Sequence, residues 1–203
     1  MSKIIVLGLV SLSILFGISG CGSSDDGSDN SSSNQTFDLR DYIAPKVDSV
    51  FSFDMYQTKN NQDKFGGTYT KQYLVIDRKI VEIREKQEWT TEIFDNKLKD
   101  SDGYYKRFIK VGDIIRGETC KTTFDAYYET KEFIVNSTKF TFNDIIKIVS
   151  ICKYDEFSKL ETNNYNYFAK DKGFIFGEHQ YCELDKYNNI KFCDIDKEIL
   201  NLD

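Results

Sequence analysis

From Phe37 onward, the sequence consists of short segments in which apolar residues occupy every second position. Phe51, Phe53 and Met55 show this spacing. Side chains two residues apart project from the same face of a strand, so a period of two is typical of a strand with one buried face and one wet face. Turns rich in Asn, Asp, Gly and Lys separate the segments. The pattern predicts a mainly β, antiparallel domain.

The apolar spacing also gives approximate element positions. Residues 58–67 are polar and end in two glycines, so they are interpreted as a turn. A short helix is expected at residues 39–43, ahead of Pro45, and another at residues 196–202, where Ile195, Ile199 and Leu202 follow helical spacing. Strands are expected at residues 50–56, 68–76, 80–89, 90–94, 104–111, 114–116, 120–128, 132–135, 139–142, 145–152, 165–168, 174–177, 180–184 and 190–193.

Several β architectures satisfy this pattern. A curved meander, a half-open barrel and a small sandwich all provide one wet face for each sheet, and the sequence does not choose among them. No motif recurs at a fixed spacing, which argues against a propeller or a solenoid. The 203 residues, of which 40% are hydrophobic, suffice for one domain with a substantial core.

The charge balance and the histidine content restrict the function. A formal net charge of -6 leaves no basic excess to neutralise phosphates, so a nucleic-acid partner is not expected. His179 is the single histidine, which excludes any site built on a histidine pair. No cofactor or metal site is predicted.

Residues 1–20 have the composition of an export signal. Lys3 supplies a positive charge, and the apolar run at residues 4–18 is too short to span a bilayer, which takes about 20 residues. Ser19 and Gly20 then precede Cys21, as small residues precede a signal cleavage site.

Ile18, Ser19, Gly20 and Cys21 resemble the lipobox of bacterial lipoproteins. The resemblance implies that Cys21 is lipidated and becomes the N-terminus, and it implies nothing about activity. Several acyl chains, palmitate among them, would anchor the protein stably. In that family an Asp after the cysteine favours the inner membrane. Gly22 stands there instead, so we expect an outer-membrane lipoprotein that faces the periplasm.

Residues 22–36 contain no apolar side chain, so they cannot bury surface and are predicted to form a disordered tether. Such a tether would reach about 20 Å on average. Its aspartates do not match the spacing of an EF-hand calcium loop. The expected organisation is therefore a signal peptide at residues 1–20, a lipidated tether at residues 21–36 and one β domain at residues 37–203.

A second, shorter resemblance lies nearer the C-terminus. Residues 165–175 are similar to a strand pair of many uncharacterised bacterial envelope lipoproteins, with a Tyr-Tyr-Ala-x-Gly-x-Gly-aliphatic pattern in which Asp171 replaces the first glycine. Residues 40–43 and Pro45 resemble the entry segment of the same proteins. These motifs imply a β-rich periplasmic module of unknown role, with no catalytic residues.

Four cysteines remain after Cys21, and an even number in an exported protein predicts two disulfides. Cys182 and Cys193 flank a hairpin that turns at residues 187–189, which would place the two residues opposite one another within bridging distance. Cys120 and Cys152 then pair by elimination. A zinc site is the alternative, although no CxxC motif occurs.

The sequence offers few candidates for chemistry. His179 is surrounded by Gly177, Glu178 and Gln180, which we interpret as an exposed turn between two strands, so a catalytic histidine is not predicted. Trp89 is interpreted as a core or edge anchor rather than a platform for a ligand. No nucleophile elbow, phosphate loop, dinucleotide fingerprint or zinc-protease helix occurs. Scattered carboxylates are interpreted as a solvated face rather than a glycosidase pair.

Two functions fit these observations. The first is a membrane-anchored, non-catalytic envelope lipoprotein whose β domain contacts proteins or supports the envelope. The alternative is a carrier or chaperone that holds a hydrophobic ligand, such as a lipid or an acyl chain, in a curved sheet. A carrier requires an apolar concavity larger than a packed core needs.

Overall fold

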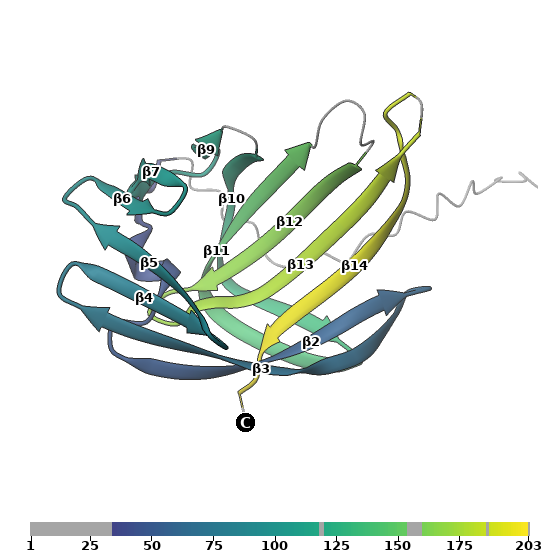
Figure 1. Cartoon of the computed structure of the whole chain (residues 1–203), viewed down its shortest axis with the longest axis horizontal. Coiled ribbons are helices and arrows are strands. Elements are labelled where there is room, and N and C mark those ends of the chain that lie inside the picture. Colours follow the sequence, from purple (N-terminus) through teal and green to yellow (C-terminus); the bar gives the residue numbers. More distant parts are fainter. Residues whose placement is uncertain (1–33, 118–119, 154–159, 186, 203) are drawn as a thin grey trace, which may run out of the picture.

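The structure is a computed structural model that describes residues 34–117, 120–153, 160–185 and 187–202. Almost all of them lie in one antiparallel sheet of 12 strands, which curves until it nearly closes on itself (Figure 1). The prediction of a mainly β, antiparallel fold is confirmed, and the half-open barrel is the alternative that the chain adopts. The predicted signal peptide, the predicted lipidation site Cys21 and residues 22–33 of the predicted tether lie outside the described residues.

The sheet follows the order β7, β6, β5, β4, β3, β2, β14, β13, β12, β11, β10, β9, so strands that follow one another in the sequence pair throughout both halves. β14 pairs with β2 and joins the two halves. The strands are β2 (Ser49–Lys59), β3 (Gln62–Ile76), β4 (Lys79–Arg84), β5 (Gln87–Ile93), β6 (Lys97–Asp100), β7 (Gly103–Lys106), β9 (Ile114–Gly117), β10 (Cys120–Val135), β11 (Thr138–Lys153), β12 (Leu160–Ala169), β13 (Gly173–Leu184) and β14 (Ile190–Leu200).

The N-terminal segment fills one end of the curved sheet. It contains β1 (Phe37–Asp38) and the one-turn helix α1 (Arg40–Ile43), and β1 pairs with β8 (Phe108–Ile109). Arg107 holds it with a bidentate ion pair to Asp38, at 2.7 to 3.1 Å. The expected helix at residues 39–43 is therefore confirmed to within one residue.

A second core lies on the outer face of the sheet. The far ends of β10 and β11 fold over that face, where the ring of Phe133 lies 4.6 Å from Phe176 of β13 and 4.9 Å from Tyr167 of β12. The backbone N–H of Asn136, at the tip of this hairpin, donates to Asp63 of β3 over 3.1 Å. Register shifts in β2, β10 and β12–β13 accompany this bending, since a bulge increases the local twist.

The turn between β12 and β13 accounts for Asp171 and Gly173, the two pattern positions of residues 165–175 that lie in it or directly after it. Asp171 and Gly173 both have left-handed φ values, 61° and 81°. A Cβ at Gly173 would lie 3.1 Å from the Cα of Ala44, so this position requires glycine. Asp171 tolerates its conformation because aspartate is among the residues that adopt it most often.

Three local predictions are wrong. Residues 196–202 are not a helix, because residues 196–200 belong to β14, which pairs with β13 and β2 on its two sides. Residues 62–67 are not part of a turn, because the reversal needs only Asn60 and Asn61, both with positive φ. His179 is not in a turn, because the two strands expected around it are one continuous strand, β13.

Candidate functional site

The inner face of the sheet is identified by contacts between strands that are far apart in the sheet order. Leu98 of β6 and Phe124 of β10 belong to one buried cluster, with Phe37, Leu39 and Tyr42 of the N-terminal segment between the two walls. Two strands near opposite edges of a sheet can share a cluster only where the sheet curls round it. The face that carries Leu98 and Phe124 is therefore the inside of the half-barrel.

The inner face becomes polar two residues further along the strands from this apolar cluster, which is the next position on the same face; we call this spacing one step. Residues directly opposite one another in antiparallel strands lie on the same face. The register places six polar residues in one line across β9 to β14, each opposite the next, and we call this line the polar row: Arg116, Thr122, Ser150, Asn164, His179 and Asp196. All six side chains are half-buried.

Hydrogen bonds connect neighbours in the polar row. The hydroxyls of Thr122 and Ser150 lie 2.9 Å apart, and Nδ1 of His179 lies 3.0 Å from Oδ1 of Asn164. Because the oxygen of Asn164 only accepts, Nδ1 carries the proton in this arrangement and Nε2 is the basic nitrogen. The row is thus a hydrogen-bonded line of hydroxyl, amide and imidazole groups.

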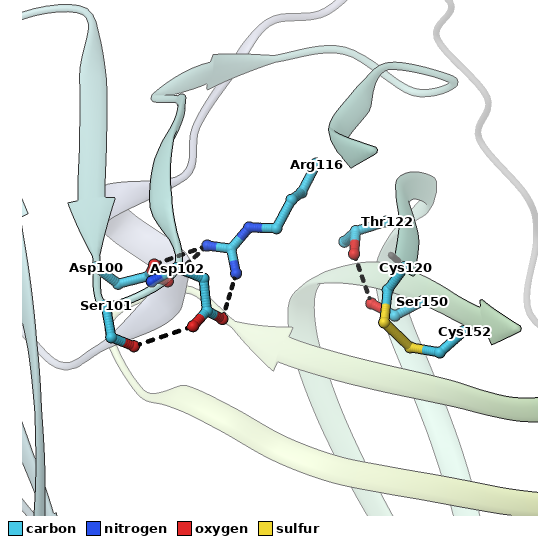
Figure 2. A network of polar contacts seen from close by, with 8 residues as sticks. All are labelled: Asp100, Ser101, Asp102, Arg116, Cys120, Thr122, Ser150 and Cys152. Carbon is cyan, nitrogen blue, oxygen red and sulfur yellow. Dashed lines mark hydrogen bonds and ion pairs between the residues drawn. A yellow bond between two sulfur atoms is a disulfide. The ribbon is translucent and has the colours of Figure 1, made fainter. Parts of the chain in front are cut away.

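Arg116 at one end of the polar row closes the barrel. Its guanidinium bridges the gap between β9 and the turn of the β6–β7 hairpin, with 2.7 Å contacts to Asp100 and to Asp102 (Figure 2). β9 and β7 are the two edge strands of the sheet. The same figure shows the Thr122–Ser150 pair beside the Cys120–Cys152 disulfide.

The position of the His179 ring depends on a glycine two residues before it. A Cβ at Gly177 would lie 3.0 Å from Nε2 of His179 and 2.8 Å from the ring of Phe174. Gly177 is directly opposite Glu198, so the imidazole leans over the backbone toward this carboxylate. Burial is the largest influence and lowers the pKa of His179, although Glu198 and Asp196 act in the opposite direction.

A second group of charged residues lies on the same face beside the polar row. Glu198 accepts a hydrogen bond from the hydroxyl of Tyr69 and lies 3.8 Å from Arg84. Burial, followed by this carboxylate, raises the pKa of Tyr69. Lys71 is buried, pairs with Glu82 at 3.2 Å, and lies 4.4 Å from the centre of the Phe174 ring. These cations are matched by carboxylates within the fold.

Two exposed aromatic residues share the inner face. Tyr181 lies one step along β13 from His179, opposite Asp194, and is 50% exposed. Trp89 of β5 is directly opposite Glu82 and is 43% exposed. Trp89 is therefore not a core residue. Its position fits the edge part of the prediction, because among the described residues β5 pairs with β6 only at Glu92 and Ile93 and Trp89 pairs with β4 alone.

Both predicted disulfides are present. Cys120 is bonded to Cys152 and Cys182 to Cys193, and each pair is directly opposite in adjacent strands. The Cys120–Cys152 bridge lies on the inner face, one step beyond Thr122 and Ser150, so it fixes the register that aligns their hydroxyls. Cys182 neighbours Tyr181, so the second bridge lies on the outer face.

The structure corrects the interpretation of His179, because the side chain is half-buried in the middle of a strand and bonded to Asn164. Sequence reasoning missed Thr122, Ser150, Asn164 and Asp196 altogether. A weak signal did exist: Thr122 and Ser150 each stand where the period of two in their strand would place an apolar residue. Only the register reveals that these interruptions line up.

Within the described residues, no cluster of three or more His, Cys, Asp or Glu side chains has an arrangement that could hold a metal ion. No helix among those residues is long and apolar enough to cross a membrane.

Comparisons with known proteins give little further information. No family model and no solved structure matches this chain. The CRISPR-associated endoribonuclease Cas13a of Leptotrichia shahii is 26% identical over 163 residues, which cover 77% of this chain but only 11% of that protein. A similarity of this extent does not establish a family.

Proposed function

We propose that this chain is a non-catalytic, lipid-anchored envelope protein whose half-barrel binds a small polar ligand on its inner face. The observation that carries the proposal is the polar row from Arg116 to Asp196, in which half-buried hydrogen-bonding groups from six adjacent strands lie in one line. Polar groups inside a concave surface are a common feature of small-molecule sites.

The filling of the barrel argues for a polar ligand rather than a lipid. The apolar part of the inner face packs against the protein's own Phe37, Leu39 and Tyr42, which are at most 4% exposed. An acyl chain would have to displace this segment, together with the Arg107–Asp38 ion pair. The polar row, by contrast, has partly accessible side chains. We therefore favour a polar ligand over the hydrophobic ligand of the carrier alternative.

An RNA-cleaving role receives less support. The inner face carries Asp194 and Asp196 on β14, and the whole chain has a net charge of -6. Both features repel a phosphate backbone, whose binding depends on cationic side chains. The similarity to part of Cas13a does not outweigh this charge argument.

The anchor is tested by fractionation. Cys21→Ala should remove the acyl chains and release the protein from membranes, because Cys21 is the lipidated residue of the lipobox. Mass spectrometry of the N-terminal peptide measures the acyl mass directly. An unchanged membrane fraction and an N-terminal peptide without acyl mass would contradict the anchor.

Ligand binding is tested on the native protein. We expect native mass spectrometry of material purified from its own membranes to show a bound small molecule. Asn164→Ala should remove that molecule, whereas the matched control Asn143→Ala should retain it, since Asn143 is exposed on β11. Unliganded protein in every preparation would contradict the proposed function.

A further inference from the structure

We infer that the ligand of the polar row is a saccharide, bound through its hydroxyl groups. This inference rests on the proposed function and names the chemical class that the site would take. Three features of the inner face support it: the mixture of donors and acceptors in the row, the sign of the charge at the β14 end of the row, and two exposed aromatic residues on the same face.

The hydrogen-bonding capacity of the row is mixed. After their mutual bond, the hydroxyls of Thr122 and Ser150 together retain one donor and several acceptor positions. Asn164 uses its oxygen toward His179, which leaves the two N–H groups of its amide as donors. Asp196 can only accept. The row therefore presents both donors and acceptors, and a ligand must offer both.

A hydroxyl group both donates and accepts, so a ligand with several hydroxyls can pair with both the donors and the acceptors of the row. An ammonium group only donates and would leave the amide of Asn164 and the hydroxyl donors without partners. A phosphate or carboxylate only accepts, and it would meet Asp194 and Asp196 on β14. Of these three ligand classes, only an uncharged ligand with several hydroxyls can pair with both the donors and the acceptors of the row without bringing negative charge beside the aspartates of β14.

The aromatic residues provide a surface for the apolar side of a sugar ring. Tyr181 is one step from His179 on the same face of β13, and half of its side chain is accessible. Trp89 projects from the same face of the opposite wall and is 43% exposed. Aromatic rings with one accessible face pack against C–H groups while neighbouring polar groups bind the hydroxyls.

The single tryptophan of the chain makes the experiment direct, because all indole fluorescence comes from Trp89. We would titrate the full-length lipoprotein in detergent with a hexamer of N-acetylglucosamine and with maltohexaose. Palmitate and spermine serve as comparison probes. We expect at least one saccharide to change the fluorescence saturably. Asn164→Ala and Asp196→Asn should each weaken that binding about tenfold or more, which corresponds to about 1.4 kcal/mol.

The control variant Asn143→Ala should bind the saccharide as the unmodified protein does, and circular dichroism should show that each variant is folded. Row-dependent binding of palmitate or spermine without saccharide binding would overturn the saccharide inference and leave the proposed function intact. The saccharide inference also fails alone if no probe binds but the purified protein carries another molecule that Asn164→Ala removes. Absence of both probe binding and a bound molecule would overturn the inference and the proposed function together.

Discussion

The inner face of the half-barrel has two parts that differ in what covers them. At one end, Phe124 and Ile148 belong to the cluster that packs against the N-terminal segment, and both are buried. At the other, Thr122 and Ser150 lie on the same strands and the same face, but only one step further along, and they are half-buried. The strand pairing is continuous across the boundary. Side-chain chemistry alone therefore decides which part the chain covers itself.

This difference has a simple physical origin. Burial of a phenylalanine or isoleucine releases water from apolar surface, so the end that carries them attracts Phe37, Leu39 and Tyr42. Burial of a hydroxyl or an imidazole yields no such gain unless each polar atom finds a partner. The polar row meets part of that demand with bonds between its own members and, at Arg116, with bonds to Asp100 and Asp102.

The largest effect is expected from two substitutions at neighbouring positions of β10. Phe124→Ala should lower the free energy of unfolding by about 3–5 kcal/mol, because it opens a cavity between the sheet and the N-terminal segment. Thr122→Ala removes one half-buried hydrogen bond and should cost about 1 kcal/mol. Urea denaturation measures both. Equal costs at the two positions would show that the two parts do not differ in the proposed way.

Removing each disulfide in turn compares the inner face, which carries Cys120–Cys152, with the outer face, which carries Cys182–Cys193. Loss of Cys120–Cys152, with 32 residues of sequence separation, should cost about 4 kcal/mol in the chain-entropy model. Loss of Cys182–Cys193, with a separation of 11, should cost about 3 kcal/mol. Paired Cys→Ser variants and chemical denaturation measure the two costs. In addition, ligand binding should become weaker only when the Cys120–Cys152 bridge is lost, since this bridge aligns Thr122 with Ser150. Weaker binding in the second pair alone would argue against that alignment.

Arg116→Ala tests the contact that closes the barrel, where Arg116 of β9 meets the β6–β7 hairpin; we call this contact the seam. Loss of the contacts to Asp100 and Asp102 should cost about 1–2 kcal/mol, because the charged hydrogen bonds are about one-quarter exposed on the Arg116 side. Hydrogen exchange should increase in β7 and β9 but not in β13. Arg78→Ala is the matched control, as its pair with Asp95 is 70% and 93% exposed and should contribute almost nothing. Unchanged exchange in β7 and β9 would show that Arg116 does not hold the seam.

The smallest effect is a pH dependence that arises from His179. Burial lowers its pKa in the folded state below the unfolded value of about 6.5, so the unfolded chain takes up the proton first as the pH falls. Stability from this residue is therefore complete above pH 6.5 and decreases below it. Denaturation curves between pH 5 and pH 7.5 should show this loss, and His179→Gln should remove it. A loss of equal size in the variant would assign the effect to other groups.

The sequence by itself determined the β class of the domain and both disulfide pairs. Those features depend on local rules: a period of two defines strand faces, and a short hairpin places Cys182 opposite Cys193. The sequence-based predictions were wrong where contacts in the tertiary structure outweighed a local preference. Ile195, Ile199 and Leu202 have helical spacing, but β13 and β2 offer hydrogen bonds on both sides of residues 196–200, and pairing with both strands overrides the local preference.

The candidate site was decided by the tertiary structure alone. Thr122, Ser150, Asn164 and Asp196 are ordinary polar residues in the sequence, separated by up to 74 positions, and no motif connects them. They form a line because four successive antiparallel registers, with His179 on β13 between Asn164 and Asp196, bring neighbours opposite one another. A slip of one residue in any pairing would move a member to the other face. His179 looked exposed for the same reason. Its polar neighbours in the sequence point away from it, while Asn164, which bonds it, lies on the adjacent strand.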